Sequence, residues 1–158
     1  MKKILTATAV AAALAAGNAQ AGSTSGQFNV NITLTSACTL AAVSPVVFAY
    51  TSNQAALQNA TGGGFNVTCT NTLPYTFGLQ AGSGAATPPG AATLSITDNA
   101  VNLTYGLALS AAGGTGNGAS QSYSVTGTMA GSQLGTCATA SCTNGAATNK
   151  TQTLIVNY

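Results

Sequence analysis

The sequence predicts an all-β fold for nearly the whole chain. Short alternating or β-branched runs recur from residue 27 to residue 158, and breaks rich in Gly, Asn, Pro and Ser separate them. Helical periodicity is absent after the first 21 residues. About eight short strands in one domain are typical of a β-sandwich of immunoglobulin-like type, for which a closed barrel is the structural competitor.

The first 21 residues have the pattern of a secretory signal peptide. Lys2 and Lys3 precede a short apolar run over residues 4–16, and residues 19–21 form a small-residue cleavage site. The apolar run is too short to anchor the chain in a bilayer. We therefore expect export, a mature chain that begins near Gly22, and no membrane insertion.

The first expected strand reads GQFNVNITL over residues 26–34. Its apolar residues stand at every second position, the period of a half-buried strand, and they are Phe28, Val30, Ile32 and Leu34. Breaks rich in Gly, Asn, Pro and Ser recur between the strands expected farther along the chain. The expected strands are, in order, residues 27–35, 46–50, 64–70, 75–81, 93–97, 101–110, 121–130 and 151–158.

Charge is almost absent from the mature chain. Removing residues 1–21 from the 158 leaves 137, enough for one domain, and their only charged side chains are Asp98 and Lys150. No basic stripe exists to neutralise phosphates, so we expect no binding to nucleic acid. A neutral polar surface lets subunits approach closely with little dependence on salt or pH, which suits permanent assembly.

The same shortage of charged and titratable side chains excludes most catalytic sites. The chain has no His and no Glu, so neither a Ser/His/Asp arrangement nor a pair of carboxylates can be built. Asp98 stands in ITDNAV between two expected strands, where we expect it to form an Asx turn. Lys150 precedes the last strand and is expected to be solvated. The sequence predicts a protein that is not an enzyme and that needs no cofactor or metal.

The cysteines predict disulfides. Four cysteines, Cys38, Cys69, Cys137 and Cys142, occur in a chain that we expect to be exported to an oxidising space. Zinc binding is disfavoured, because the chain has no His and the spacings form no paired CxxC motifs. Three pairings of the four cysteines are compatible with the sequence.

Six segments, in this order, carry a resemblance to a known family: GQFNVNITLTSACTL (26–40), PVVFAY (45–50), FNVTCTNTLPYTFGLQAG (65–82), VNLTYGLALS (101–110), YSVTGTM (123–129) and TLIVNY (153–158). They resemble the spore coat protein U domain family and, within it, the major subunits of archaic chaperone/usher pili. Two departures stand out. Ala49 occupies a position where Gly is usual, and residues 135–150 replace a short acidic turn.

The resemblance implies an incomplete immunoglobulin-like β-sandwich that is completed by an N-terminal donor strand from a neighbouring subunit. Residues 22–36 would be the donor segment and residues 37–158 the sandwich domain. The donor side chains that fill the neighbour's groove would be Phe28, Val30, Ile32 and Leu34. Family order also implies the disulfides Cys38–Cys69 and Cys137–Cys142.

The resemblance further implies the partners and the location. The partners would be identical or related pilin subunits, a periplasmic chaperone and an outer-membrane usher. The chain would pass through the periplasm and end in a surface fimbrium that serves adhesion and biofilm formation.

Two other functions stay open at this point: a carbohydrate-binding adhesin module that uses the loops 82–91 and 111–119, and a secreted coat protein that never forms pili. Folding of the donor strand onto the segment that follows it is disfavoured, because the connecting residues 35–37 contain neither Gly nor Asn.

Overall fold

A computed structural model describes residues 22–158; the predicted signal peptide, residues 1–21, lies outside the described residues. The chain divides after Thr33 into two units, and each is described by itself. Residues 22–33 are exposed and form no strand in the single chain, although the sequence predicts one over residues 27–35. An extended segment becomes a strand only when a neighbouring strand takes up its main-chain hydrogen bonds.

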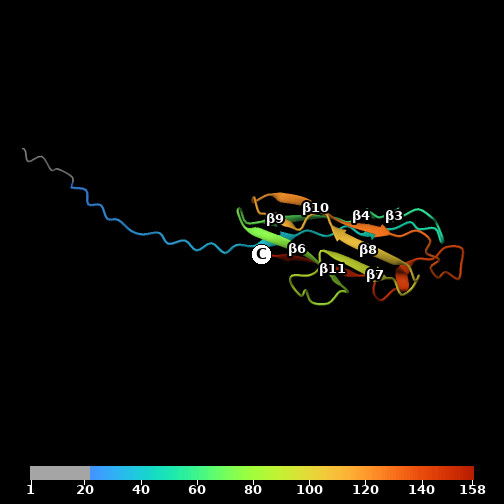
Figure 1. The fold of residues 1–158 in the computed structure, drawn as a ribbon. Coiled ribbons are helices and arrows are strands. Elements are labelled where there is room, and N and C mark those ends of the chain that lie inside the picture. The colour runs from blue at the N-terminus through green and yellow to red at the C-terminus, as the bar shows by residue number, and fades with distance from the viewer. Residues whose placement is uncertain (1–21) are drawn as a thin grey trace, which may run out of the picture. The chain divides into compact units, whose positions relative to one another are not determined.

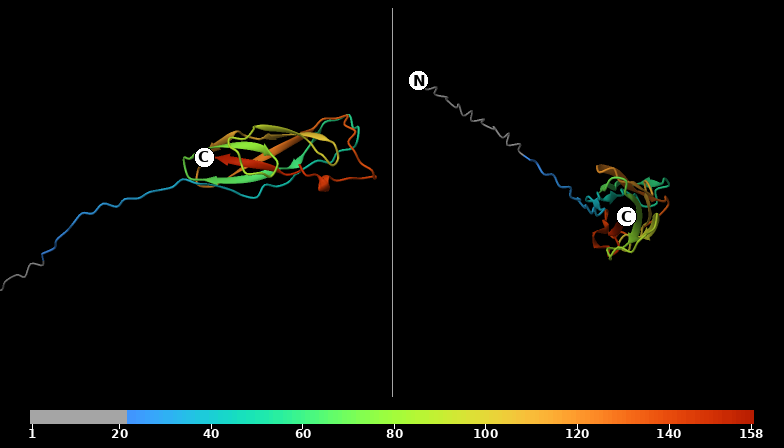
Figure 2. Two further views of the ribbon diagram at one scale, coloured as in Figure 1. Left: turned by 90° about the horizontal axis from the view of Figure 1, so that it is seen from below. Right: turned by 90° about the vertical axis from the view of Figure 1, so that its left-hand side faces the viewer.

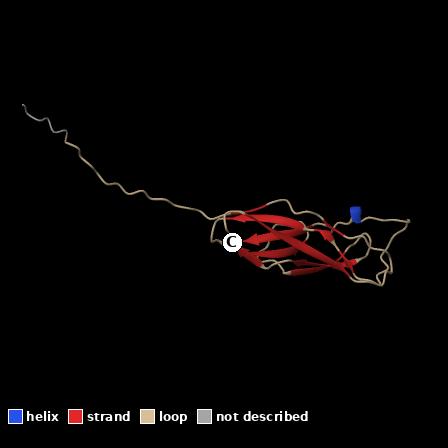
Figure 3. Ribbon diagram, turned by 90° about the horizontal axis from the view of Figure 1, so that it is seen from above, coloured by secondary structure: helices blue, strands red, loops and turns tan. Residues whose placement is uncertain are grey.

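Residues 34–158 form an all-β domain, as predicted, with one short 3-10 turn at Asn144–Ala146 (Figure 3). The strands are β1 (Cys38–Leu40), β2 (Val46–Val47), β3 (Gln58–Asn59), β4 (Thr61–Gly62), β5 (Gly64–Cys69), β6 (Pro74–Ala81), β7 (Thr93–Thr97), β8 (Thr104–Leu109), β9 (Gly113–Thr115), β10 (Ser120–Met129) and β11 (Gln152–Asn157).

Two antiparallel sheets make up the domain, and they confirm the predicted sandwich. The larger sheet has the order β1-β5-β10-β8-β7, with β3 also on β10, and the smaller has the order β11-β6-β9. A short ribbon joins β2 to β4. Both sheets end in edge strands within the described residues, which distinguishes the fold from a closed barrel.

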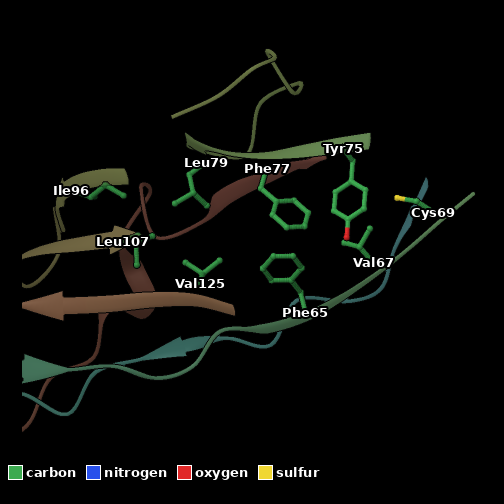
Figure 4. Packing of buried hydrophobic residues seen from close by; sticks show 9 residues of the cluster. All are labelled: Phe65, Val67, Cys69, Tyr75, Phe77, Leu79, Ile96, Leu107 and Val125. Carbon is green, nitrogen blue, oxygen red and sulfur yellow. The ribbon is translucent and has the colours of Figure 1, made fainter. Parts of the chain in front are cut away.

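The core lies between the sheets and follows the two-residue period of the strands. From β6, Tyr75, Phe77 and Leu79 point toward the other sheet, where Phe65 and Val67 of β5 face them (Figure 4). Residues between these on each strand are mostly exposed. Period-two alternation in the sequence therefore identified the buried faces of both strands.

The domain has two distinct ends. Cys38 of β1 lies opposite Cys69 of β5, and the turn 70–73 leads directly to β6, which pairs near its start with Asn157 of β11. The chain therefore enters β1 and leaves β11 at one end, which we call the root end. The turn 98–103 and the segment 131–150 lie at the opposite end, which we call the loop end (Figure 1 and Figure 2, left).

Both predicted disulfides are confirmed. Cys38 and Cys69 are joined at the root end with their Cα atoms 4.1 Å apart, and Cys137 and Cys142 are joined at the loop end with a Cα separation of 5.7 Å. In the chain-entropy model the first bridge, which spans 31 positions, stabilises the domain by about 3–4 kcal/mol. It fixes the point at which residues 34–37 join the sandwich.

Some strand boundaries differ from the prediction. Of residues 46–50, only Val46–Val47 form a strand, and the strand predicted over 101–110 begins at Thr104. The second difference arises because Asp98 organises a turn that continues through Asn102, whose φ is 51°. The short strands β1, β3, β4 and β9 were not predicted.

Candidate assembly groove

The last strand, β11, has one open edge. On its other side it pairs with β6 along its whole length. On β6, the main chain of Leu79 bonds to Ala91, on the side away from β11. Successive residues of a strand bond to opposite sides, so Gly78 and the residues two positions from it on β6 are those that bond to β11. Ile155 faces Gly78 in this ladder. The N–H and C=O groups of Leu154 and Val156 therefore point to the open edge and are available to another strand.

A groove with a volume of about 640 Å³ lies beside this open edge. Residues 43–50 line one side of it, and residues 150–154 line the other. Between them, apolar side chains from both sheets lie at its base, namely Leu79, Leu103, Tyr105, Leu107, Val125 and Met129. The groove is thus open to solvent on the side where a further strand of the smaller sheet would lie.

The groove lies toward the loop end of the domain, and we call the part lined by Gln152 and Leu154 its deep part. Toward the root end, aromatic rings fill the space between the sheets: Phe77 contacts Phe65 and Tyr123 with centroid distances of 5.2 Å and 4.7 Å. The Tyr75 hydroxyl lies 2.6 Å from the Tyr123 hydroxyl, and burial followed by this hydrogen bond raises the pKa of Tyr75 to about 12. Neither Phe77 nor Val156 lines the groove.

Apolar side chains along the groove are left partly in water. Leu154 and Val46 line the groove and pack against the core but remain only partly buried, and Val47 is 53% exposed. Leaving such side chains exposed forgoes about 25 cal/mol for each Å² of apolar surface. A strand laid into the groove would cover them.

The loop end of the groove is polar. Asp98, which is 2% exposed, accepts hydrogen bonds from the Asn144 side chain at 2.9 Å and from the N–H groups of Ala100 and Val101 at 2.9 and 3.0 Å. The predicted Asx turn is therefore confirmed. Lys150 is exposed, as predicted, and its ammonium donates a hydrogen bond to the carbonyl of Gly145.

The hydrogen bonds outweigh burial at Asp98. Burial alone would raise the pKa of this carboxyl group, but the hydrogen bonds from Asn144, Val101 and Ala100, together with the charge of Lys150, hold the pKa below its usual value. The carboxylate therefore ties the 142–150 segment to the turn 98–103. A second tie is the Asn149 side chain, which donates to the carbonyl of Thr97 at 2.8 Å.

This arrangement predicts acid sensitivity of the domain. A carboxyl group whose pKa is depressed on folding contributes stability that is present above its unfolded pKa of about 3.9 and is lost as the pH falls through the folded value. For Asp98→Asn we expect unfolding free energy at pH 7 to fall by about 1–3 kcal/mol. The further fall in unfolding free energy that the unchanged protein shows between about pH 5 and pH 2 should be largely absent in Asp98→Asn.

Urea unfolding of both proteins at pH 7, 4 and 2.5 measures this. Asp98 is the only side-chain carboxyl group in the chain, so the comparison is direct. An equally steep acid loss in Asp98→Asn would show that another group carries the pH dependence.

The four predicted donor side chains lie in the described residues and are exposed. Phe28 is 85% exposed, Val30 71%, Ile32 86% and Leu34 78%. Four large apolar side chains at alternate positions are costly to leave in water. The sequence identified this segment, but it did not identify the groove, whose lining residues are spread from Val43 to Leu154.

Comparison with known families agrees with this description. The model of the Spore Coat Protein U domain matches residues 24–156 of the chain. The chain belongs to the Spore Coat Protein U domain family. A search of curated proteins found no match, and a search of solved structures found none either. This family is a structural one, associated with coats and linked to chaperone/usher pili.

The Spore Coat Protein U domain match begins at Thr24 and so includes the segment 26–34. Within residues 22–158, no helix is long and apolar enough to cross a membrane, and no three of the residue types His, Cys, Asp and Glu lie together as a metal site would require.

Proposed function

We propose that this Spore Coat Protein U domain is the structural subunit of a chaperone/usher pilus, in which residues 26–34 of one copy fill the groove of another. The observation that carries the proposal is the combination of an open strand edge with an apolar groove beside it. The same chain supplies a segment whose four apolar side chains are exposed. Strand addition at an open edge gives affinity through main-chain hydrogen bonds and specificity through alternate side chains.

The burial energy is large enough for permanent assembly. Fully burying an apolar side chain is worth about 1.5–3 kcal/mol, so the four donor side chains together contribute about 6–12 kcal/mol. This is comparable to the stability of a whole domain, about 5–15 kcal/mol. A filled groove would therefore be far more stable than an empty one.

The direction of the strands favours a second copy over the chain's own arm. β11 runs from the loop end to the root end, and the arm joins the domain at the root end. If the arm folded back into its own groove, it would run parallel to β11 and would have to reverse direction within Thr35–Ala37. An arm from a second copy that enters from the loop end runs antiparallel to β11.

Antiparallel insertion also produces an open chain. The body of the donating copy then lies beyond the loop end of the accepting copy, and its own groove stays free for the next arm. Such head-to-tail contacts extend without closing. Parallel insertion would instead bring the root ends of two copies together. The arm of each copy could then fill the groove of the other, which gives a closed dimer.

The same features explain why assembly factors would be needed. An empty groove and an exposed apolar arm, together in one chain, are an aggregation hazard before assembly. We propose that a periplasmic chaperone covers the groove and that an outer-membrane usher exchanges it for the arm of the next subunit. The product would be a surface fimbrium that serves adhesion and biofilm formation.

The adhesin alternative receives less support. Residues 82–91 and 111–119 do not line the groove. The first loop is fixed on the sheet, since the Gln80 side chain bonds to Ala85 and Thr87 and the Asn157 side chain donates to the carbonyl of Pro89 at 3.1 Å. A secreted coat protein without pili would leave the groove without a partner.

Deletion of residues 22–34 tests the proposal. We expect the folded domain to be exported but the SDS-resistant polymer to be lost, as judged by electrophoresis without boiling. The matched control deletes only residues 22–25, which are polar and precede the alternating run; it should assemble normally. Unchanged polymer after the longer deletion would contradict the proposed function.

A further inference from the structure

The groove and the arm together define one alignment of the two strands. We infer that residues 26–34 of a second copy lie antiparallel to β11 with Ile32 opposite Leu154, and that this register is set by the polar loop end of the groove. The inference rests on the proposed function and adds which residues meet. In this register the remaining opposed pairs are Phe28 with Tyr158, Val30 with Val156, and Leu34 with Gln152.

The faces of the two strands restrict the register to steps of two residues. Leu154 and Val156 pack against the core and lie opposite Leu79 and Phe77, so their side chains point inward. Side chains of directly opposed residues share a face, so the apolar residues of the donor must stand opposite the even-numbered residues of β11. A shift of one residue would expose all four donor side chains.

A shift of two residues toward the loop end is disfavoured by polarity. It would place Leu34 opposite Lys150, beside Asn144 and the buried carboxylate of Asp98. Segment 142–150 is held there by its hydrogen bonds to the turn 98–103 and by the Cys137–Cys142 disulfide. An apolar side chain would have to enter this region without a polar partner for the groups that it covers.

A shift of two residues toward the root end is disfavoured by burial. It would carry Phe28 farther past Asn157, where β11 ends, and place the hydroxyl group of Ser36 at the level of Gln152. The part of the groove beside Gln152 is also lined by Tyr105, whose hydroxyl group accepts a hydrogen bond from the Gln152 side chain at 3.3 Å. A serine would leave this part largely unfilled, which forfeits both burial and packing contacts.

The inferred register matches Val30, Ile32 and Leu34 to their surroundings. Ile32 and Leu34 enter the deep part beside Leu154 and Gln152, whereas Val30 meets the region that Phe77 and the other aromatic rings already fill. The polar residues Thr35 and Ser36 then leave the groove beside Asn144 and Lys150. The arm therefore changes from apolar to polar residues after Leu34, at the same level at which the groove lining changes from apolar to polar.

Paired cysteines measure the register directly. Main-chain groups of Asn157 bond to β6, so Asn157 and the donor residue opposite it form a non-hydrogen-bonded pair with Cα atoms about 4.5 Å apart. This separation suits a disulfide, and a shift of two residues does not. The domain contains a pair of the same kind, since Cys38 lies directly opposite Cys69.

The experiment combines Asn157→Cys with Gln27→Cys, Asn29→Cys or Asn31→Cys in the full chain. We expect only Asn29→Cys to give a covalent ladder of subunits on boiling in SDS without reductant, and we expect reductant to abolish it. The pair Thr33→Cys with Thr153→Cys reports the same register nearer the loop end and serves if changes at Asn157 prevent folding.

The outcomes separate the register from the function. A ladder from Gln27→Cys or Asn31→Cys, with the polymer intact, would overturn the register and leave donor-strand assembly standing. A cross-linked monomer would show that the arm fills its own groove. Polymer that survives deletion of residues 22–34 would overturn the proposed function itself.

Discussion

Placing a charge on the inward face of the arm is expected to abolish assembly. In Ile32→Asp the side chain that would enter the deep part of the groove beside Leu154 becomes a carboxylate without a partner. An uncompensated buried charge costs about 3–5 kcal/mol, in addition to the lost apolar burial. Together these terms amount to about 4.5–8 kcal/mol, so we expect the affinity of the arm for the groove to fall by roughly 10³–10⁶-fold.

The matched control is Asn31→Asp, which adds the same charge one residue before Ile32. Because side chains alternate along a strand, the side chain of residue 31 faces outward when that of residue 32 faces inward. Asn31→Asp should assemble nearly as the unchanged chain does. Because Ile32 is 86% exposed in the single chain, Ile32→Asp should leave the thermal stability of the free subunit unchanged. Polymer yield and thermal melting of the isolated subunit measure the two effects. Equal loss of polymer in both variants would show that net charge, and not its position, disrupts assembly.

The longer strands could be predicted because their signal is local. In β5 and in residues 74–77 of β6, each buried residue alternates with a more exposed one, so the period of two was visible in the sequence. The donor segment was recognisable in the same way. Its four apolar residues alternate with polar ones whether or not a partner strand is present.

β9 could not be predicted, because it has almost no side chains. Gly113–Thr115 read as part of a Gly-rich break, yet the segment pairs with Pro74–Thr76. A Cβ atom at Gly114 would approach the hydroxyl groups of Tyr75 and Tyr123 to 2.8 Å, so the glycine lets this strand lie close to the aromatic rings. Nothing in the local sequence indicates that those tyrosines lie nearby.

The groove could not be predicted either, since it is formed by residues that are far apart in the sequence. Its two sides come from residues 43–50 and 150–154, and its base includes Leu107 and Val125. Its polar end depends on the contact of Asp98 with Asn144, which are 46 positions apart. Sequence patterns identify the faces of strands but not which of these faces are left without a neighbour.

The most direct measurement supplies the missing strand within one chain. Because β11 ends at the root end, a copy of GQFNVNITL joined after Tyr158 through a flexible Gly/Ser linker of about six residues can turn back and lie antiparallel to β11 in its own groove. The native arm, residues 22–34, is deleted. The control carries the same extension with Ser in place of its four apolar residues.

We expect the extended chain to be monomeric and its thermal midpoint to exceed that of the control by more than about 10 °C, since burial of four apolar side chains contributes about 6–12 kcal/mol before the cost of ordering the segment. Equal midpoints in the two chains, measured by thermal melting at the same concentration, would contradict the claim that the groove is completed by this segment.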